Sequence, residues 1–494
     1  MIRRSRIQLA VLAVLLLPGS ASVRAQAGPG SAQSTASNAS SASPGSSSNV
    51  SSPSSSTSQN FSGSVPTKLV PGVLPISLQD AIDRGLKQNL GLLLSDADIG
   101  AARGQRWQQL SNLLPHLSAA PYADVSQVNL AEFGFTFHFP GFNIPSVVGP
   151  FSYFDARAYL TQSLLDLKSL NSTLASSERL KSAQYTYKDA RDLVVLSVGY
   201  SYLQGIADEA YIEAVSAQVN TAQALYNQAS DQVSAGTSPA IDALRAHVEL
   251  QTQQQQLIQA KNSFAIQKLN LAHVIGLAPG QEFDLTDKSA YQPFEAMSVD
   301  QALKQAYESR SDYQAALADV HAAEYSRKAA VAEHYPTLAL SGNYGIAGQH
   351  FDSNHGVFDV RGTLTIPIFQ GGLAHGDVLQ ADAQLQQSRE RLENLRDQID
   401  SDVRTALLNL ESSREEVDVA QSNIDLAEQT LAQSRDRFAA GVTNSVEVVQ
   451  SQEAVASAHN QYISSLYNFN YAKISLARAV GAAEEGVKEY FKGK

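Results

Sequence analysis

Three residues that could bind a metal ion lie close together in the sequence. His350, Asp352 and His355 form a His-x-Asp-x-x-His pattern, and imidazole and carboxylate groups are common zinc ligands. Histidines are also common in loops, and this segment is predicted to be a loop, so we expect no metal and no cofactor. The chain has no cysteine, no His-Glu-x-x-His run and no glycine-rich phosphate loop. We therefore expect that the protein is not an enzyme.

Composition and the N-terminal residues indicate an exported protein that does not bind nucleic acid. The net charge is −12, which disfavours contact with phosphate backbones. A basic start is followed by an apolar run over 7–17 and by small residues up to Ala25, so we interpret residues 1–25 as a signal peptide. Residues 26–70 are mainly Ser-rich and predict a disordered linker. No later stretch is apolar for long enough to form a transmembrane helix.

The rest of the chain contains the same motifs twice, in the same order. Residues 76–82 resemble 297–303, and Pro115 and Pro336 follow these segments at the same distance. The repeat is much longer than the units of a solenoid. We therefore predict two pseudo-equivalent halves, residues 71–285 and 286–494. Further matching pairs are Phe154-Asp155-Ala156-Arg157 with Phe358-Asp359-Val360-Arg361, Gly236 with Gly441, and 271–276 with 476–481.

Most of each half is predicted to be helical. From Leu392 onward, apolar residues recur at spacings of three and four, which is typical of long packed helices. The segments 169–235 and 373–440 contain no proline, and at ~1.5 Å per residue each helix would reach roughly 100 Å. Shorter helices are predicted over 77–113 and 240–275. Two short helices placed end to end could lie against one long helix.

A third kind of segment alternates strictly between apolar and polar residues. It occurs at 337–346 and 358–368, and more weakly at 154–161 and 117–123. This alternation predicts strands with one apolar and one polar face, about as long as the strands of membrane barrels. A soluble hairpin packed on the helices is the alternative. Four strands cannot close a barrel, and an open edge is not tolerated in lipid, so in a membrane several chains would have to combine their strands.

These motifs together resemble those of the TolC-like outer-membrane efflux protein family, over about residues 76 to 485. The resemblance rests on helix openings of the form Leu-x-x-Ala-(Ile/Leu), on a proline between helix and strand, on a strand-to-helix junction and on a closing Leu-Ala-Arg-Ala-x-Gly run. In this sequence the helix openings are residues 78–82 and 299–303, and the prolines are Pro115 and Pro336. The strand-to-helix junction is 366–372, with a degenerate copy at 162–166, and the closing run is 476–481.

The resemblance implies a mainly α-helical fold with a membrane β-barrel part. Each chain of a homotrimer would give four strands to a twelve-stranded barrel in outer-membrane lipid, and the long helical hairpins would form an α-barrel in the periplasm. The loops at 125–150 and 347–356 would lie outside the cell. Residues expected to face lipid are Leu338, Leu340, Tyr344, Leu364 and Ile366; those expected to face the pore are Thr337, Ser341, Asn343, Asp359, Arg361 and Thr363.

The implied function is the exit duct of a tripartite efflux or type I secretion system, with passive transport. Its partners would be a periplasmic adaptor and an inner-membrane pump. An elongated periplasmic coiled-coil scaffold without a pore is the alternative function. In the family, the turns of the helical hairpins are similar to the surfaces that meet the adaptor. The matching residues here are Gly236, Thr237, Ser238, Gly441, Val442 and Thr443, and the two glycines also fit helix C-caps.

The resemblance also implies a periplasmic gate just after the second turn. Family members can carry two acids three residues apart there; this chain has Glu447 and Gln450. Three copies of Glu447 would form a carboxylate ring that binds cations. Asp242 is the matching acid of the first half, and in the family it can bond to an aromatic residue at the position of Phe438. Phe438 has no hydroxyl group, so the sequence leaves open how the pore is held shut.

Overall fold

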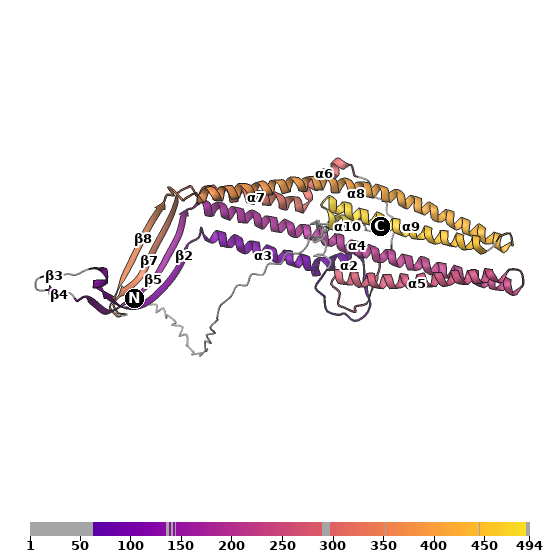
Figure 1. The fold of residues 1–494 in the computed structure, drawn as a ribbon, viewed down its shortest axis with the longest axis horizontal. Helices are drawn as coiled ribbons and strands as arrows, with labels where there is room; N and C mark the ends of the chain where they lie inside the picture. Colours follow the sequence, from indigo (N-terminus) through magenta and orange to yellow (C-terminus); the bar gives the residue numbers. More distant parts are fainter. Residues whose placement is uncertain are drawn as a thin grey trace, which may run out of the picture. The chain divides into compact units, whose positions relative to one another are not determined.

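The computed structural model describes residues 63–134, 138–139, 142–143, 145–288, 297–350, 352–443 and 445–490. All of them belong to one compact unit, residues 53–494. The predicted signal peptide and residues 26–62 of the predicted linker lie outside the described residues. The described chain alternates helices with strands in an order that repeats once, as the duplicated motifs predict (Figure 1).

The two long helices form where the sequence predicts them. Helix α4 spans Leu167–Ser234 and α8 spans Leu373–Ala439. Each continues through a tight turn into a helix of about half its length, α5 (Ala240–Val274) or α9 (Ser445–Ala479). The two hairpins lie side by side, with α9 in contact with both α4 and α5 (Figure 1).

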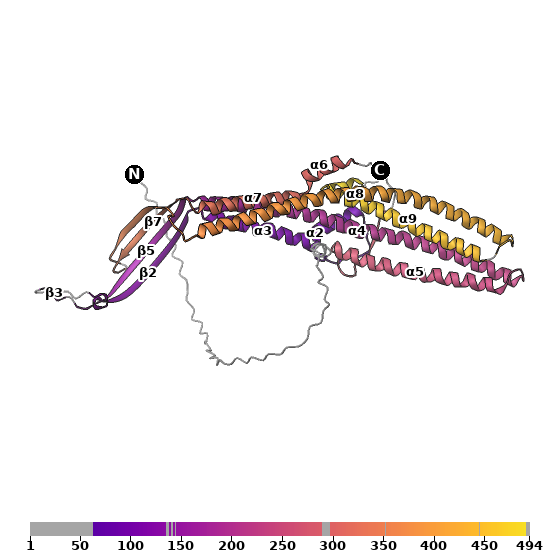
Figure 2. The same ribbon diagram turned by 45° about the horizontal axis from the view of Figure 1, so that its top comes forward.

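The predicted single helix over 77–113 is wrong, because the chain breaks at Asn89. Helix α2 (Leu78–Gln88) ends there and α3 (Leu90–Ser111) begins, with the Asn89 side chain accepting a hydrogen bond from the backbone N–H of Leu92 at 3.3 Å. The second half repeats this break at Arg310, between α6 (Val299–Ser309) and α7 (Ser311–Ala332). Helices α3 and α7 then run along α4 and α8 (Figure 2).

A glycine with a left-handed backbone lies against the break in each half. Gly481 ends the segment after α9 with φ +75°, and a Cβ atom there would come within 2.6 Å of the Arg310 backbone nitrogen. Gly276, with φ +71°, lies equally close to Gln88. Only glycine adopts this conformation without strain. Each half therefore repeats the same close contact between a glycine turn and the helix break.

The N-terminal segment of the described chain is docked on the first half. Residues 63–70 were predicted to be the end of the disordered linker, but Thr67 N–H donates to Gly276 O at 2.9 Å and Val70 N–H donates to the Gln281 side chain at 2.8 Å. Strand β1 (Leu74–Ile76) then pairs in parallel with β6 (Phe283–Leu285). These backbone bonds hold the segment beside the ends of α2 and α5.

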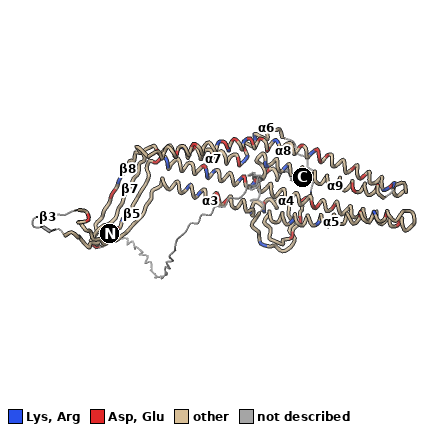
Figure 3. Tube along the Cα trace, viewed as in Figure 1, with Lys and Arg blue, Asp and Glu red and all other residues tan. Residues whose placement is uncertain are grey.

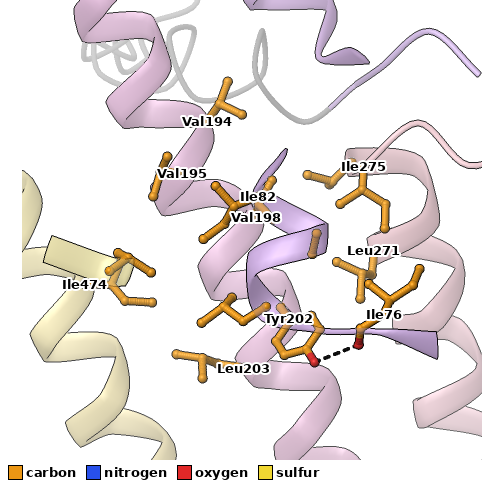
Figure 4. Packing of buried hydrophobic residues seen from close by; sticks show 14 of the residues in the cluster. Ile76, Ile82, Val194, Val195, Val198, Tyr202, Leu203, Leu271, Ile275 and Ile474 are labelled. Atoms are coloured by element: carbon orange, nitrogen blue, oxygen red, sulfur yellow. Dashed lines mark hydrogen bonds between the residues drawn. The ribbon is translucent and has the colours of Figure 1, made fainter. Parts of the chain in front are cut away.

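The largest apolar core surrounds α4 near this small sheet (Figure 4). Tyr202 is fully buried there, and its hydroxyl donates to Ile76 O at 2.9 Å. Ile474 of α9 joins the same cluster, so the core connects the two halves. The C-terminal helix α10 (Ala483–Tyr490), which the sequence analysis did not predict, packs against α4 and α9.

Four strands form one antiparallel sheet in the order β2-β5-β7-β8. They are β2 (His116–Asn129), β5 (Val147–Leu165), β7 (Thr337–Gly348) and β8 (Asn354–Thr365). The first two strands are longer than predicted, so part of the expected 125–150 loop is strand. That connection also contains the turn η1 (Leu130–Phe133) and the strands β3 (His138–Phe139) and β4 (Phe142–Asn143).

Strand β8 begins and ends earlier than predicted. The alternation suggested a strand to residue 368, but β8 ends at Thr365, directly before Ile366 and Pro367. Proline has no N–H group to donate to the strand ladder, which explains the earlier end. Charged side chains are plentiful on the helices and sparse on the strands (Figure 3). Within the four strands they are Asp124, Asp155, Arg157, Asp359 and Arg361.

Candidate functional site

The sheet has one apolar and one polar face, as the alternation predicts. The register places Leu338 opposite Leu364 and Tyr344 opposite Phe358 on the apolar face. Tyr344 and Phe358 are 74% and 78% exposed, so no described part of the chain covers them. The polar face carries the other expected residues as cross-strand pairs: Thr337 with Thr365, Ala339 with Thr363, Ser341 with Arg361, and Asn343 with Asp359.

A group of charged and aromatic residues lies on the polar face of β5. Asp155 is only 1% exposed. Its carboxylate accepts a hydrogen bond from the Tyr153 hydroxyl at 2.9 Å and lies 2.5 Å from the Arg157 guanidinium. Because these residues alternate along one strand, all three side chains share one face. The ion pair with Arg157 thus neutralises the charge of the buried Asp155 carboxylate.

The two hairpin turns have the same backbone geometry. At the first, Gly236 N–H donates to Val233 O at 3.0 Å and Thr237 N–H to Gln232 O at 2.9 Å. At the second, Gly441 and Val442 make the corresponding bonds to Phe438 O and Arg437 O. This is the Schellman arrangement, and the φ angles of +71° and +73° explain both glycines. The expected adaptor-contact residues Gly236, Thr237, Gly441 and Val442 are exposed, and Ser238 and Thr443 are half-buried.

Asp242 connects the two hairpins. Its side chain is buried and accepts a hydrogen bond from the Ser238 hydroxyl at 2.8 Å within its own turn. Its other carboxylate oxygen accepts from the Ser445 hydroxyl at 2.7 Å, across to the first residue of α9. Ser445 was not identified from the sequence, because a serine at a helix start has an ordinary role as a cap. The hydroxyl that Phe438 lacks is thus provided by Ser445.

Phe438 has an apolar role at the tips. It is 5% exposed and lies in a cluster to which all four hairpin helices contribute. The cluster contains Leu225, Ala229, Ala246, Leu431, Phe438, Val448 and Val455. The cluster and the Asp242–Ser445 bond are therefore the contacts that join the hairpins near their turns.

Glu447 has partners within its own chain. Its carboxylate accepts a hydrogen bond from Arg437 Nη1 at 2.8 Å and another from the Thr443 hydroxyl. Arg437 lies ten residues earlier, across the turn, and was not identified from the sequence. Gln450 lies one turn further along α9 and is exposed. The structure therefore brings Asp242, Phe438 and Glu447 to the same end of the hairpins, with Arg437 and Ser445 as added members.

A second polar group, which we call the charged network, lies at the helix break of the second half. Arg310 has a 5% exposed side chain and reaches Asp312 at 2.6 Å and Asp402 at 3.1 Å. Arg478 of α9 pairs with Asp189 of α4, and Arg191 of α4 pairs with Glu484 of α10 at 2.8 Å. Burial raises the pKa of the neighbouring Asp192 to about 6, although the positive charge of Arg478 acts in the opposite direction. Ion pairs thus join both halves here.

The metal-binding pattern is not assembled in the structure. Among the described residues, no group of three or more His, Cys, Asp or Glu side chains could hold a metal ion. His350 lies in the 349–353 connection with its Nδ1 3.2 Å from the Ser152 hydroxyl, and His355 lies in β8 opposite Ala347. None of the described helices is both long and apolar enough to cross a membrane.

Comparisons with known proteins agree on one family. Residues 81–277 and 302–482 match the family model described as outer membrane efflux protein. The chain is 22% identical to outer membrane protein TolC of Escherichia coli (strain K12) over 351 residues, 67% of this chain and 70% of TolC. It is 24% identical to outer membrane protein OprJ of Pseudomonas aeruginosa over 442 residues, 84% of this chain and 86% of OprJ.

The fold is also that of a solved outer membrane protein. The structure of VceC from Vibrio cholerae superposes with a TM-score of 0.70 at 18% identity, covering 82% of this chain and 96% of VceC. Each of the two segments matched by the family model lies within one of the two predicted halves. The chain therefore shares its fold with VceC.

Proposed function

Because the chain belongs to the outer membrane efflux protein family, we propose that it forms the homotrimeric exit duct of a tripartite efflux or type I secretion system. As a member of this family it is located in the outer membrane and extends into the periplasm. The family is one of efflux proteins rather than enzymes. Beyond family membership, we propose that three copies form a twelve-stranded barrel and that transport is passive. We also propose a gate at the hairpin tips and, as partners, a periplasmic adaptor and an inner-membrane pump.

The four-stranded sheet carries this proposal. Strands β2 and β8 are the ends of the strand order, so each has one edge without a neighbouring strand among the described residues. Unpaired N–H and C=O groups are not tolerated in lipid. Four strands from each of three copies would give twelve, which is an even number within the range of bacterial barrels. The apolar face would then meet lipid, and the polar face with Arg157 and Arg361 would line water.

Two matched substitutions in β8 test the barrel. Val360 is on the apolar face and Thr363 on the polar face. We expect Val360→Asp to impair assembly, because a charged side chain that faces lipid destabilises a barrel most near the bilayer midplane. Thr363→Asp should assemble as a heat-modifiable trimer that conducts ions in planar bilayers. Equal tolerance of both variants, with a monomeric protein that passes no current, would exclude the duct and leave the poreless scaffold.

The gate is proposed at the hairpin tips. Asp242, Ser445 and the cluster around Phe438 join the two hairpins at the end remote from the sheet, and Glu447 is paired with Arg437 within the second hairpin. Loss of these contacts would allow the α8–α9 hairpin to move away from the α4–α5 hairpin and widen the entrance. Gln450, exposed beside Glu447 on α9, would line the entrance without adding charge.

The hairpin turns are proposed to contact a periplasmic adaptor, which in turn would recruit an inner-membrane pump. Val442 is 70% exposed at the second turn, and no described residue covers it. A photo-crosslinking amino acid at Val442 should capture the adaptor in cells. The same group at Val419, which is 61% exposed along α8, is the matched control. Equal capture at both positions, or capture only at Val419, would contradict contact through the turns.

A further inference from the structure

A pocket of about 350 Å³ lies between the two hairpins and borders the apolar tip cluster, to which its lining residues Leu431 and Val455 belong. All four hairpin helices contribute to its wall. Part of the lining is apolar, from Ala217 and Ala222 of α4, Leu431 of α8 and Val455 of α9. The remainder is polar and includes Glu249, Gln253 and Gln452. The volume is in the range of small-molecule sites.

Glu249 is a buried carboxylate without a cationic partner. It is 7% exposed, and its side chain accepts a hydrogen bond from Gln253 Nε2 at 2.8 Å. Two basic side chains, Arg435 and His459, also line the pocket. His459 pairs with Glu428, and within the described part of the chain no lysine, arginine or histidine forms an ion pair with Glu249. A carboxylate removed from water without a counter-charge is costly. The pocket therefore favours a positive charge.

The neighbouring amide groups also lack partners. Gln253 and Gln452 are 5% and 7% exposed, and neither Gln253 Oε1 nor Gln452 Oε1 receives a hydrogen bond. The Nε2 groups of Gln218 and Gln452 likewise lack an acceptor. Buried polar groups are nearly always paired, and an unpaired one costs about 1 to 3 kcal/mol. The pocket thus offers amide oxygen acceptors beside the Glu249 carboxylate.

We propose that this pocket binds a primary organic ammonium ion. Such an ion carries one positive charge and three N–H donors, which match the Glu249 carboxylate, Gln253 Oε1 and Gln452 Oε1. Its hydrocarbon part would lie against Leu431, Val455 and the alanines. A metal ion fits less well, because the described residues contain no group of three or more metal-binding side chains. The proposal does not depend on the protein being a channel.

Occupancy would join the two hairpins. Glu249 and Gln253 belong to α5, and Gln452 belongs to α9. One ammonium group bonded to all three would add contacts between hairpins that otherwise meet through the tip contacts and the helix-break region. The bound ligand should therefore raise the melting temperature of the protein, as any ligand specific for the folded state does.

Titration of the purified full-length protein with benzylamine at pH 7.5 tests the proposal. We expect saturable binding of one molecule per chain by calorimetry, with a rise in melting temperature. Glu249→Gln keeps the shape and removes the charge, and should weaken binding at least ~10-fold. Gln452→Met should weaken it as well. Glu249→Gln removes a buried charge and Gln452→Met removes an unsatisfied buried amide, so neither should lower the melting temperature of the free protein.

The controls separate this ligand from other occupants. Glu213→Gln, an exposed change on α4 outside the pocket, should bind benzylamine as the unmodified protein does. Benzyl alcohol, which has the same ring without the charge, should not bind. Unchanged affinity in Glu249→Gln, equal binding of the alcohol, competition by millimolar MgCl₂ or CaCl₂, or no binding at all would each overturn the proposal. The last outcome would identify the pocket as a water site.

Discussion

The helix-break region and the hairpin tips join the same two halves of the chain by different contacts. At the break, the charged network connects α4, α7, α8, α9 and α10, and the largest apolar core lies beside it. At the tips, the halves meet through a small apolar cluster and the hydrogen bond between Asp242 and Ser445. The difference indicates that the hairpins separate more easily at their tips than at their bases.

This contrast fits a duct that opens at one end. Movement at the tips would break one bond to a carboxylate and expose a few side chains, whereas movement at the break would uncover paired charges. Substitutions in the charged network should therefore change stability most. Substitutions at the tips should change conductance with little effect on stability.

Removal of Arg310 should have the largest effect. Its guanidinium is buried between Asp312 and Asp402. Although burial acts to raise the pKa of Asp312, the bonds and charge of Arg310 bring it below its usual value. Arg310→Ala leaves these acids without their main partner and should cost about 3 to 5 kcal/mol of stability. Arg389→Ala, which breaks the exposed pair with Glu324, should cost at most about 1 kcal/mol. Similar melting temperatures for both variants would contradict the contrast.

Asp192 should give the charged network a measurable pH dependence. Asp189, Arg478 and Glu484 face it, and burial raises its pKa from 3.8 to about 6. Because the pKa of Asp192 is higher in the folded state, protonation of its carboxyl group stabilises the fold. This stabilisation is complete below the usual pKa of 3.8 and is lost as the pH rises through about 6. The loss is up to about 3 kcal/mol.

Asp192→Asn should avoid this loss. We expect the variant to melt at a higher temperature than the unmodified protein at pH 7.5, and the difference to shrink toward pH 4. Thermal melts from pH 4 to 8 measure it. Asp397→Asn, an exposed change on α8, serves as the control and should leave the profile unchanged. A constant difference across this range would show that Asp192 does not titrate as expected.

The long helices and the faces of the strands could be predicted because their signals are local. Helices α4 and α8 contain no proline and bury regularly spaced apolar residues. The alternation in β7 and β8 assigned side chains to the correct faces without knowledge of the register. The breaks at Asn89 and Arg310 could not be predicted, because they depend on contacts with turns at Gly276 and Gly481 that are distant in the sequence.

The site was predictable only in part, for a similar reason. Family resemblance identified Asp242, Phe438 and Glu447, and the structure places all three near the hairpin turns. The partners of these residues depend on side-chain directions across the turns. Ser445 reaches Asp242 from the other hairpin, and Arg437 reaches Glu447 from the preceding helix. Neither residue type is unusual at its position, so the sequence contains no signal for either contact.

Loss of the Asp242–Ser445 bond tests the tip side of the comparison. Ser445→Ala removes a hydroxyl that is bonded to a buried carboxylate at 2.7 Å. The change should weaken the closed tip by about 1 to 2 kcal/mol, which corresponds to a roughly 5- to 30-fold larger open population. Planar bilayer recordings should show more frequent opening, with a melting temperature close to that of the unmodified protein. Ser434→Ala, which removes a bond within the second hairpin, should not change opening.

The smallest expected effect concerns charge at the proposed entrance. Two substitutions there should change the block by divalent cations in opposite directions. Glu447 is paired with Arg437, and both side chains are partly exposed, so their attraction is worth at most about 1 kcal/mol. Arg437→Ala would free three Glu447 carboxylates in the proposed trimer, so divalent cations should block the current more strongly. Glu447→Ala leaves three guanidinium groups, and block by divalent cations should weaken. Identical block in the two variants would mean that neither side chain faces the ion path, and the gate would then have to be sought among the apolar contacts of Phe438.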